Sequence, residues 1–201
     1  MKIELPQPNM TAGLDLFKAI RERRSIRSYA DEALDPSQIS DLLFHTSGIT
    51  GDRPRMLASP SAGAIHAIKT YLIAYDIQGI EKGIYVYDKE SHSLEQTFEG
   101  DVRQPLSEAC FEQKMFTHAP AVVAFSVNID RIRQRYRERS PRYAAMDCGH
   151  YGHNIYLVCE ALGLATVAVG AFDDDAANRA LAVSDEEQVY YIFPIGEKNN
   201  E

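Results

Sequence analysis

Apolar residues near the N-terminus recur at the spacing of a helix. Leu14, Phe17 and Ile20 lie three residues apart, which predicts a helix over residues 12–23. Residues 1–10 hold two prolines and no periodic pattern, so we expect an extended arm there.

Two further helices have recognisable ends. Residues 35–38 read Asp-Pro-Ser-Gln, which combines an N-cap, a proline at the first helical position and a glutamine three residues after the cap. The helix that starts there is expected to end at Gly48. A longer helical pattern runs from about residue 144 to residue 162, and Gly163 is placed to end it.

Six runs have the alternating or continuously apolar pattern of β-strands. They cover residues 69–77, 83–88, 93–98, 121–127, 165–171 and 188–195. The second and third runs predict a hairpin, and the fourth is apolar throughout, as in a strand buried on both faces. The remaining segments predict helices at 101–111 and 176–182, a basic helix or mobile segment at 130–139, and a long irregular loop at 48–64. Together they predict one α+β domain over residues 1–201, with a central sheet flanked by helices.

The composition is that of an ordinary globular protein, and its charge narrows the possible partners. Hydrophobic residues make up 45% of the 201 residues and charged residues 25%. The 21 Lys and Arg against 29 Asp and Glu leave a net charge of −8, which disfavours nucleic acid and anionic membranes as partners. A local basic patch can still hold a single phosphate.

Cysteine usage and the N-terminus predict a cytoplasmic location. Cys110, Cys148 and Cys159 are odd in number and have no close pair, as expected of reduced thiols. We also expect no membrane span, because there is no signal-peptide pattern and no apolar run approaches the ~20 residues that a span needs.

Two short segments could bind a cofactor. Arg23, Arg24, Ser25 and Arg27 lie where a helix opens out, and guanidinium groups match the donor geometry that a phosphate needs. Such a run is more often a solvated basic helix end. Residues 59–64 are small (SPSAGA), so their backbone could approach a flat ring, although plain surface loops have the same composition.

The long helix and the C-terminal segment hold weaker candidates. His150 and His153 are three residues apart, but no further ligands accompany them and we predict no metal site. Gly149 and Gly152 each cost a helix ~1 kcal/mol relative to alanine, which predicts close packing against a cofactor or another helix. Lys198 could add a charge to a phosphate site or belong to a solubilising tail.

The order of these segments resembles the nitroreductase superfamily. RRSIRSY follows the first helix, SPSAGA precedes a strand, RYAAMDCGHYGHNIYLVCEALGL covers the long helix, and VAVGAFDDD and YYIFPIGEK follow it. The similarity covers residues 14 to 198 and is greatest to the SagB-type dehydrogenases, which are related to thiazole- and oxazole-forming oxidases. The resemblance implies a nitroreductase-like α+β fold with a central mixed or antiparallel sheet, an intertwined homodimer, and FMN at the subunit interface.

The resemblance also implies which residues hold FMN. The residues near the ribityl phosphate would be Arg23, Arg24, Ser25, Arg27 and Lys198. Those facing the ring from the partner chain would be Pro60, Ser61, Ala62 and Gly63, and those along the flavin would be Val169, Gly170 and Ala171.

One position departs from the resemblance. Azoline-oxidising members carry a Lys-Tyr pair that handles the substrate proton, and Arg135-Tyr136 stands at the matching place as the implied catalytic pair. Arginine keeps its proton, so Arg135 cannot act as a base, whereas Tyr136 could act as an acid or a base. Tyr136 could equally be an ordinary packing contact.

The expected activity is hydride transfer between flavin N5 and a small organic or peptide substrate. NAD(P)H or the substrate itself would be the donor. No Gly-rich nucleotide motif is present, so NAD(P)H would bind transiently over the flavin. Three alternatives stay open: a flavin- or peptide-binding module without turnover, a thiazoline or oxazoline oxidase, and an enzyme that consumes flavin as a substrate.

Overall fold

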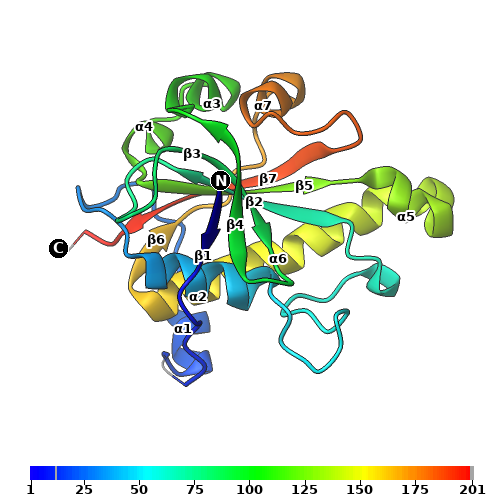
Figure 1. Cartoon of the computed structure of the whole chain (residues 1–201), viewed down its shortest axis with the longest axis horizontal. Coiled ribbons are helices and arrows are strands. Elements are labelled where there is room, and N and C mark those ends of the chain that lie inside the picture. Colours follow the sequence, from blue (N-terminus) through cyan, green and yellow to red (C-terminus); the bar gives the residue numbers. More distant parts are fainter. Residues whose placement is uncertain (12, 200–201) are drawn as a thin grey trace.

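Seven strands form a single antiparallel sheet in the order β1-β4-β3-β2-β5-β7-β6 (Figure 1). The structure is a computed structural model that describes residues 1–11 and 13–199. The strands are β1 (Lys2–Glu4), β2 (Ile68–Ala74), β3 (Gly83–Asp88), β4 (Ser93–Glu99), β5 (Ala121–Val127), β6 (Leu164–Thr166) and β7 (Gln188–Glu197). All six pairings between these strands are antiparallel.

Helices cover both faces of the sheet. They are α1 (Leu16–Glu22), α2 (Pro36–Ser47), α3 (Arg103–Ala109), α4 (Met115–His118), α5 (Ile129–Tyr136), α6 (Ser140–Leu162) and α7 (Asp174–Ala180), with 3-10 turns η1 (Ala62–Ala64) and η2 (Arg137–Arg139). Helices α2 and α6 lie on one face, and α3, α4 and α7 lie on the other (Figure 1). Among the described residues, no helix is both long and apolar enough to cross a bilayer.

Strand β5 explains why the core has two layers. Every residue of β5 is buried, and alternate side chains point to opposite faces of a strand. Phe125 packs toward α6, where its ring centroid lies 5.5 Å from that of Tyr151. Val122 and Ala124 join the layer under α3 and α7. The prediction of a strand buried on both faces is confirmed.

Local signals set several helix ends as predicted. Asp35 accepts a hydrogen bond from the Ser37 amide (2.7 Å), and Gln38 completes a capping box at the start of α2, which ends at Gly48. Gly163 ends α6 in the left-handed conformation with φ 77°, a region that glycine enters without the Cβ clash of other residues.

Two predictions for the N-terminal region are corrected. Residues 2–4 are extended as predicted, but they are part of the sheet and not an arm, because they pair with β4 as an edge strand. The first helix begins at Leu16 rather than at residue 12, because Asp15 caps it by accepting from the Lys18 amide (3.0 Å). Ala12 lies outside the described residues.

The predicted strand at 165–171 is also corrected. Only Leu164–Thr166 form β6. The Ala168 amide donates to the Tyr156 hydroxyl (2.8 Å) rather than to a neighbouring strand, which interrupts the ladder. Val169 then rejoins β7 through an isolated bridge to Ile192.

Candidate functional site

The arginine-rich segment after α1 lies beside β6 and the end of β7. The Ile26 amide donates to the Thr166 carbonyl (2.9 Å), and the Ala30 amide donates to the Glu197 carbonyl (3.1 Å). The Lys198 amide donates to the carbonyl of Gly163 at the end of α6 (3.3 Å). The segments predicted around the phosphate therefore meet at the C-terminal end of α6.

Tyr156 on α6 joins this segment to the chain that follows β6. Its hydroxyl lies 2.9 Å from the Ser25 hydroxyl and accepts the hydrogen bond from Ala168. The Arg23 guanidinium stacks over the Tyr156 ring at 5.1 Å from its centroid. One tyrosine thus positions the arginine-rich segment and the chain that leads to Val169–Ala171.

The arginines at this end keep most of their donor capacity. Arg24 Nη1 donates to the carbonyls of Arg21 (3.0 Å) and Arg23 (2.8 Å). None of Arg23, Arg24 and Arg27 pairs with a carboxylate of residues 1–11 or 13–199. These cations can therefore serve a phosphate dianion, which charge-assisted donors bind well.

Lys198 is less available than the arginines. Its ammonium forms an ion pair with Glu160 on α6 (2.6 Å), whose side chain is only 9% exposed. A phosphate at this site would share Lys198 with Glu160, so the three arginines carry most of the free positive charge.

The main chain at 169–171 offers two free donors. Val169 exchanges amide-to-carbonyl hydrogen bonds with Ile192 (2.8 and 3.1 Å), so its backbone is already engaged. The Gly170 and Ala171 amides have no acceptor in the described part of the chain, and both residues are exposed. They can donate to the polar edge of a flat ring. The donor set of this end therefore fits FMN.

The predicted ring-facing loop is held by α6. The Ser61 hydroxyl donates to Asp147 Oδ2 (2.7 Å), and the Ala62 amide donates to both Asp147 oxygens (3.0 and 3.1 Å). Asp147 is buried. Pro60 is exposed at the start of this segment. The loop also contains three residues with positive φ, Gly63 (59°), Ala64 (52°) and His66 (49°), and such backbone clusters at functional sites.

The predicted catalytic pair lies against the same loop. Arg135 Nη1 donates to the Gly63 carbonyl (3.4 Å). A Cβ added at Gly63 would lie only 2.7 Å from the Tyr136 hydroxyl oxygen and 2.8 Å from Arg135 Nη1. The Tyr136 ring packs on Tyr143, with centroids 4.5 Å apart. The structure thus brings Arg135 and Tyr136 next to Pro60–Gly63.

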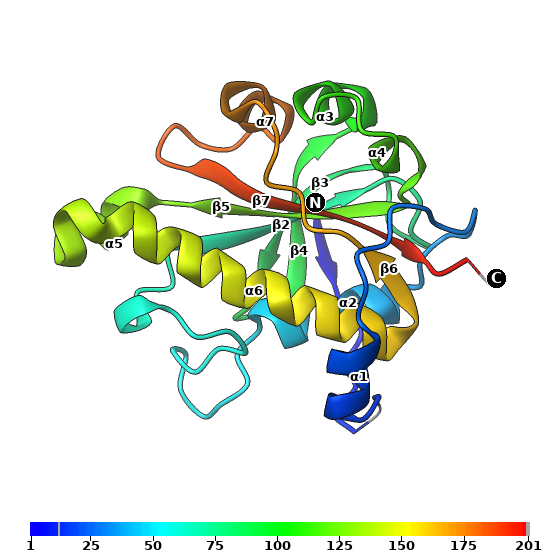
Figure 2. The ribbon, with the colours of Figure 1, turned by 180° about the vertical axis from the view of Figure 1, so that it is seen from behind.

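The two predicted halves of the cofactor site do not meet within one chain. Asp147, which holds the loop, lies thirteen residues before Glu160, which holds Lys198, and this is about 20 Å along a helix at a rise of ~1.5 Å per residue. Figure 2 shows α6 crossing the sheet, with α1 at its C-terminal end and the 48–64 loop toward its other end.

Sequence reasoning missed the residues that hold the site together. Asp147, Asn154, Tyr156 and Glu160 all lie on α6, and Asn154 Nδ2 donates to the hydroxyl of Ser59 (3.0 Å). One signal was present: Asp147 interrupts the helical pattern of apolar residues formed by Ala144, Cys148, Tyr151, Ile155 and Cys159. A carboxylate in that position needs hydrogen-bond donors from elsewhere in the chain.

The helix glycines have different surroundings. A Cβ at Gly152 would lie 2.6 Å from Cζ of Phe193 and 3.2 Å from Cε1 of Tyr191, whereas one at Gly149 would meet nothing within 4 Å. Gly152 therefore packs on aromatic rings of β7. For this glycine, the predicted packing against a cofactor or another helix is wrong. His150 and His153 are exposed, and no three His, Cys, Asp or Glu in the described part of the chain could share a metal ion.

Comparison with known proteins decides the family. The profile described as "Nitroreductase family" matches residues 20–197. The chain belongs to the nitroreductase family. Its antiparallel sheet with flanking helices is the nitroreductase-like fold, and members of the family typically use a flavin and form dimers.

Nitroreductase-family relatives cover this chain almost completely. A nitroreductase-like protein of Methanocaldococcus jannaschii is 33% identical over 198 residues, which is 98% of this chain and 97% of that protein. A nitroreductase-type crystal structure from Anabaena variabilis has a TM-score of 0.87 and 28% identity, and the match covers 99% of this chain and 42% of that one.

Two other similarities involve a trifolitoxin-processing protein and a microcin synthetase. The trifolitoxin-processing protein TfxB of Rhizobium leguminosarum is 36% identical over 120 residues, which is 57% of this chain and 32% of TfxB. A chain of the Escherichia coli microcin synthetase McbBCD complex, with truncated pro-MccB17 bound, shares the fold with a TM-score of 0.75 and 19% identity, over 98% of this chain and 78% of that one.

Proposed function

We propose that this nitroreductase-family protein is an FMN-dependent oxidoreductase that transfers a hydride between flavin N5 and a small organic or peptide substrate, with NAD(P)H as electron donor. One observation carries the proposal: arginine side chains without carboxylate partners and main-chain amides without acceptors, among the described residues, lie together at the C-terminal end of α6. Guanidinium groups without carboxylate partners suit a phosphate, and the unengaged Gly170 and Ala171 amides suit the polar edge of a ring.

Each group at this end has a proposed role in holding FMN, which supplies the redox chemistry when bound. Arg24 and Arg27 bind the phosphate. Tyr156 holds Arg23 and Ser25 in place beside them. The Gly170 and Ala171 amides stabilise negative charge on the polar edge of the ring, an effect that favours the reduced form.

The site is completed by a second copy of the chain. The Pro60–Gly63 loop is too far along α6 to reach the arginines of its own protomer, but a two-fold axis across α6 brings it to those of the partner. Exposed apolar side chains support such an interface: Leu16, Phe17 and Ile20 on α1 are 57%, 79% and 51% exposed, and Met146 on α6 is 53% exposed.

Tyr136 is the proposed acid or base for the substrate proton. It lies beside Gly63, so in the proposed dimer it faces the partner's site together with the loop. Arg135 keeps its proton and therefore orients the loop through the Gly63 carbonyl and does not accept a proton.

The second candidate narrows the substrate to a peptide. The similarities to TfxB and to the microcin synthetase complex favour the SagB-type branch, in which the chain would act as an azoline oxidase or a related peptide dehydrogenase. The arginine at position 135, in place of lysine, argues for different proton handling from that of the azoline oxidases. Three buried, unpaired thiols are typical of a reducing compartment, so we place the enzyme in the cytoplasm.

The test is retention and reduction of the flavin. The purified protein is expected to absorb near about 450 nm, as oxidised flavin does, and to bleach with anaerobic NADH or NADPH. The Arg24→Gln and Arg27→Gln variants should lose the chromophore on gel filtration. Arg21→Gln is the matched control, because Arg21 lies nearby at the end of α1 but already pairs with Glu22.

The outcomes separate the competing functions. Protein that stays colourless and whose Tm does not move with excess FMN would refute the proposal, because a ligand of the native state must stabilise that state. Flavin that bleaches with dithionite but not with NADH, NADPH or an organic donor would indicate a binding module without turnover. A monomer that still retains FMN, seen by light scattering, would refute the shared site.

A further inference from the structure

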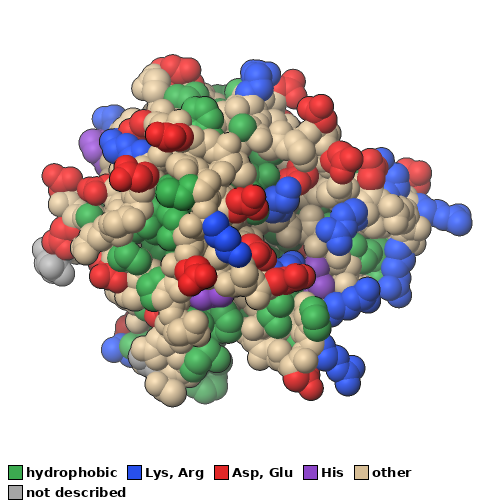
Figure 3. Space-filling view, viewed as in Figure 1, with side chains coloured by type: hydrophobic (Ala, Val, Ile, Leu, Met, Phe, Trp, Pro, Cys, Tyr) green, Lys and Arg blue, Asp and Glu red, His purple; other side chains and the backbone are tan. Residues whose placement is uncertain are grey.

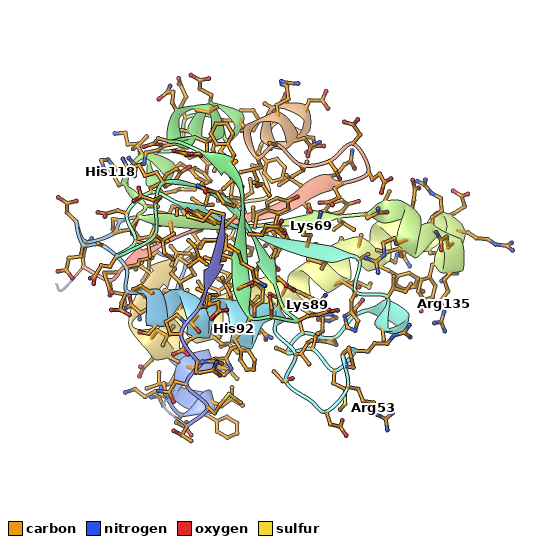
Figure 4. All side chains as sticks on the ribbon, viewed as in Figure 1. Arg53, Lys69, Lys89, His92, His118 and Arg135 are labelled. Atoms are coloured by element: carbon orange, nitrogen blue, oxygen red, sulfur yellow. The ribbon has the colours of Figure 1, made fainter. Side chains whose placement is uncertain are left out.

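A groove of about 680 Å³ lies beside the loop that carries Gly63, and most of the charged side chains that line it are cations. It lies between residues 54–66, the turn between β3 and β4, and α5. Its charged and titratable side chains are Arg55, His66, Lys89, Glu90, Arg131 and Arg135. Figure 4 labels Lys89 at the end of β3 and Arg135 on α5. Figure 3, drawn from the same side, shows several Lys and Arg side chains (blue) near α5 on the right.

The cations of the groove have no carboxylate partners. Within residues 1–11 and 13–199, none of Arg55, Lys89, Arg131 and Arg135 forms an ion pair. Arg131 Nη2 donates only to the Ile65 carbonyl (3.2 Å), which leaves the rest of its guanidinium free. Arg133, on the same helix but outside the groove, is paired with Asp130.

The charge of this groove is opposite in sign to the net charge of the chain. The protein has a net charge of −8, yet four cations face one acid, Glu90, in this groove. Lys89 is half-buried, and burial together with the nearby Arg131 lowers its pKa. His66 Nδ1 is buried and has no hydrogen-bond partner among the described residues. Like charges held together at a partly desolvated position are stabilised by a bound anion.

We propose that this groove is an oxyanion subsite of the active site, in which Lys89 and Arg131 hold a phosphate, pyrophosphate or carboxylate group of the reacting molecule. The inference rests on the proposed function, since Gly63 borders the groove and belongs to the loop proposed to face the partner's flavin. An anion anchored there places the attached reactive group at the edge of the ring.

Inorganic pyrophosphate is the probe, measured by calorimetry on protein saturated with FMN so that the arginines after α1 are occupied. Lys89→Gln and Arg131→Gln should each weaken pyrophosphate binding about tenfold, the effect of losing one charge-assisted contact. Glu90→Gln should strengthen pyrophosphate binding, because it removes the one carboxylate among the described residues that line the groove. Arg131→Lys should retain most of the binding, which separates loss of charge from loss of structure.

Arg133→Gln is the matched control and should bind pyrophosphate like the wild type. The proposal is wrong if the wild type does not bind, or if the Lys89 and Arg131 variants bind equally well. If the protein holds no flavin, the proposed function fails, but pyrophosphate binding that depends on Lys89 and Arg131 remains measurable and still supports an oxyanion site.

Steady-state kinetics then identify the source of the oxyanion. A higher KM for NADH and NADPH in Lys89→Gln, with kcat little changed, assigns the subsite to the dinucleotide pyrophosphate. A higher KM for nitrobenzoate but not for nitrobenzene assigns it to a substrate carboxylate. Unchanged KM values for both classes would overturn the assignment of the groove to the active site.

Discussion

The buried carboxylate of Asp147 accepts a hydrogen bond of 2.7 Å from the hydroxyl of Ser61, 86 residues earlier in the chain. The same carboxylate accepts the Ala62 amide, so the loop is fixed to α6 by both a side chain and the backbone. Hydrogen bonds to a buried charge are among the stronger ones in a folded protein. The position of the proposed ring-facing loop therefore depends strongly on Asp147, with Asn154 of the same helix holding Ser59 (3.0 Å).

Replacing Asp147 should loosen this loop. We expect Asp147→Ala to lower the free energy of unfolding by about 1–3 kcal/mol, because the Ser61 and Ala62 donors lose their acceptor. Urea denaturation measures the loss, and flavin fluorescence measures the accompanying release of FMN. Asp175→Ala, at an exposed position on α7, is the control. Equal stability of the two variants would contradict the role of Asp147.

The two glycines of α6 should respond in opposite ways to alanine. Gly152→Ala places a methyl group 2.6 Å from the Phe193 ring and should destabilise the protein by about 1–3 kcal/mol through overpacking. Gly149→Ala meets nothing within 4 Å and should not destabilise the protomer, because alanine is the better helix former by ~1 kcal/mol. Thermal unfolding of both variants would show the difference, and similar Tm losses would be inconsistent with the packing described.

Tyr156→Phe should weaken both the fold and flavin retention. The substitution removes the hydroxyl that contacts Ser25 and leaves the Ala168 amide without its acceptor, at an expected cost of about 1–3 kcal/mol. FMN should dissociate faster on dilution. Tyr190→Phe is a matched control, because the Tyr190 hydroxyl makes no hydrogen bond within the described chain. If both variants release FMN at the wild-type rate, Tyr156 does not organise the site.

The cysteines should be unreactive in the native protein. Burial raises the pKa of the Cys110 and Cys148 thiols to about 12, and burial also raises that of Cys159. Because the thiolate is the reactive form, its fraction at pH 8 is very small and rises only as the pH approaches the raised pKa. A thiol reagent such as DTNB should label all three only in urea. Rapid labelling of the native protein would show that the thiols are accessible.

The parts of the fold that depend on neighbouring residues follow from the sequence. The capping box at Asp35, the left-handed Gly163, the hairpin of β3 and β4 and the fully buried β5 were all predicted with bounds close to those observed. Each of these signals involves residues a few positions apart, so no knowledge of the rest of the chain is needed. Where a distant segment intervened, as Tyr156 does at Ala168, the prediction was wrong.

For the candidate site too, the kinds of residue could be predicted from the sequence, but their contacts could not. The chemical types at Arg23–Arg27 and Pro60–Gly63 were recognisable from the residues themselves, whereas Val169–Ala171 were implied only by the family resemblance. Their roles toward FMN stay predictions. The sequence alone did not show that Glu160 takes part of the charge of Lys198, or that the Val169 backbone is already engaged with Ile192. Those facts depend on which groups the packed sheet and α6 bring within hydrogen-bond distance.

By itself, then, the sequence determined most of the helices and strands and the kinds of residue available for binding a phosphate and a ring. Only the tertiary structure decided that α6 separates the loop held by Asp147 from the arginines beside Tyr156, and that four cations share a groove with a single acid. The physical reason is that local propensity acts over a few residues, whereas the site is built from contacts between segments that only the packing of α6 on the sheet brings together.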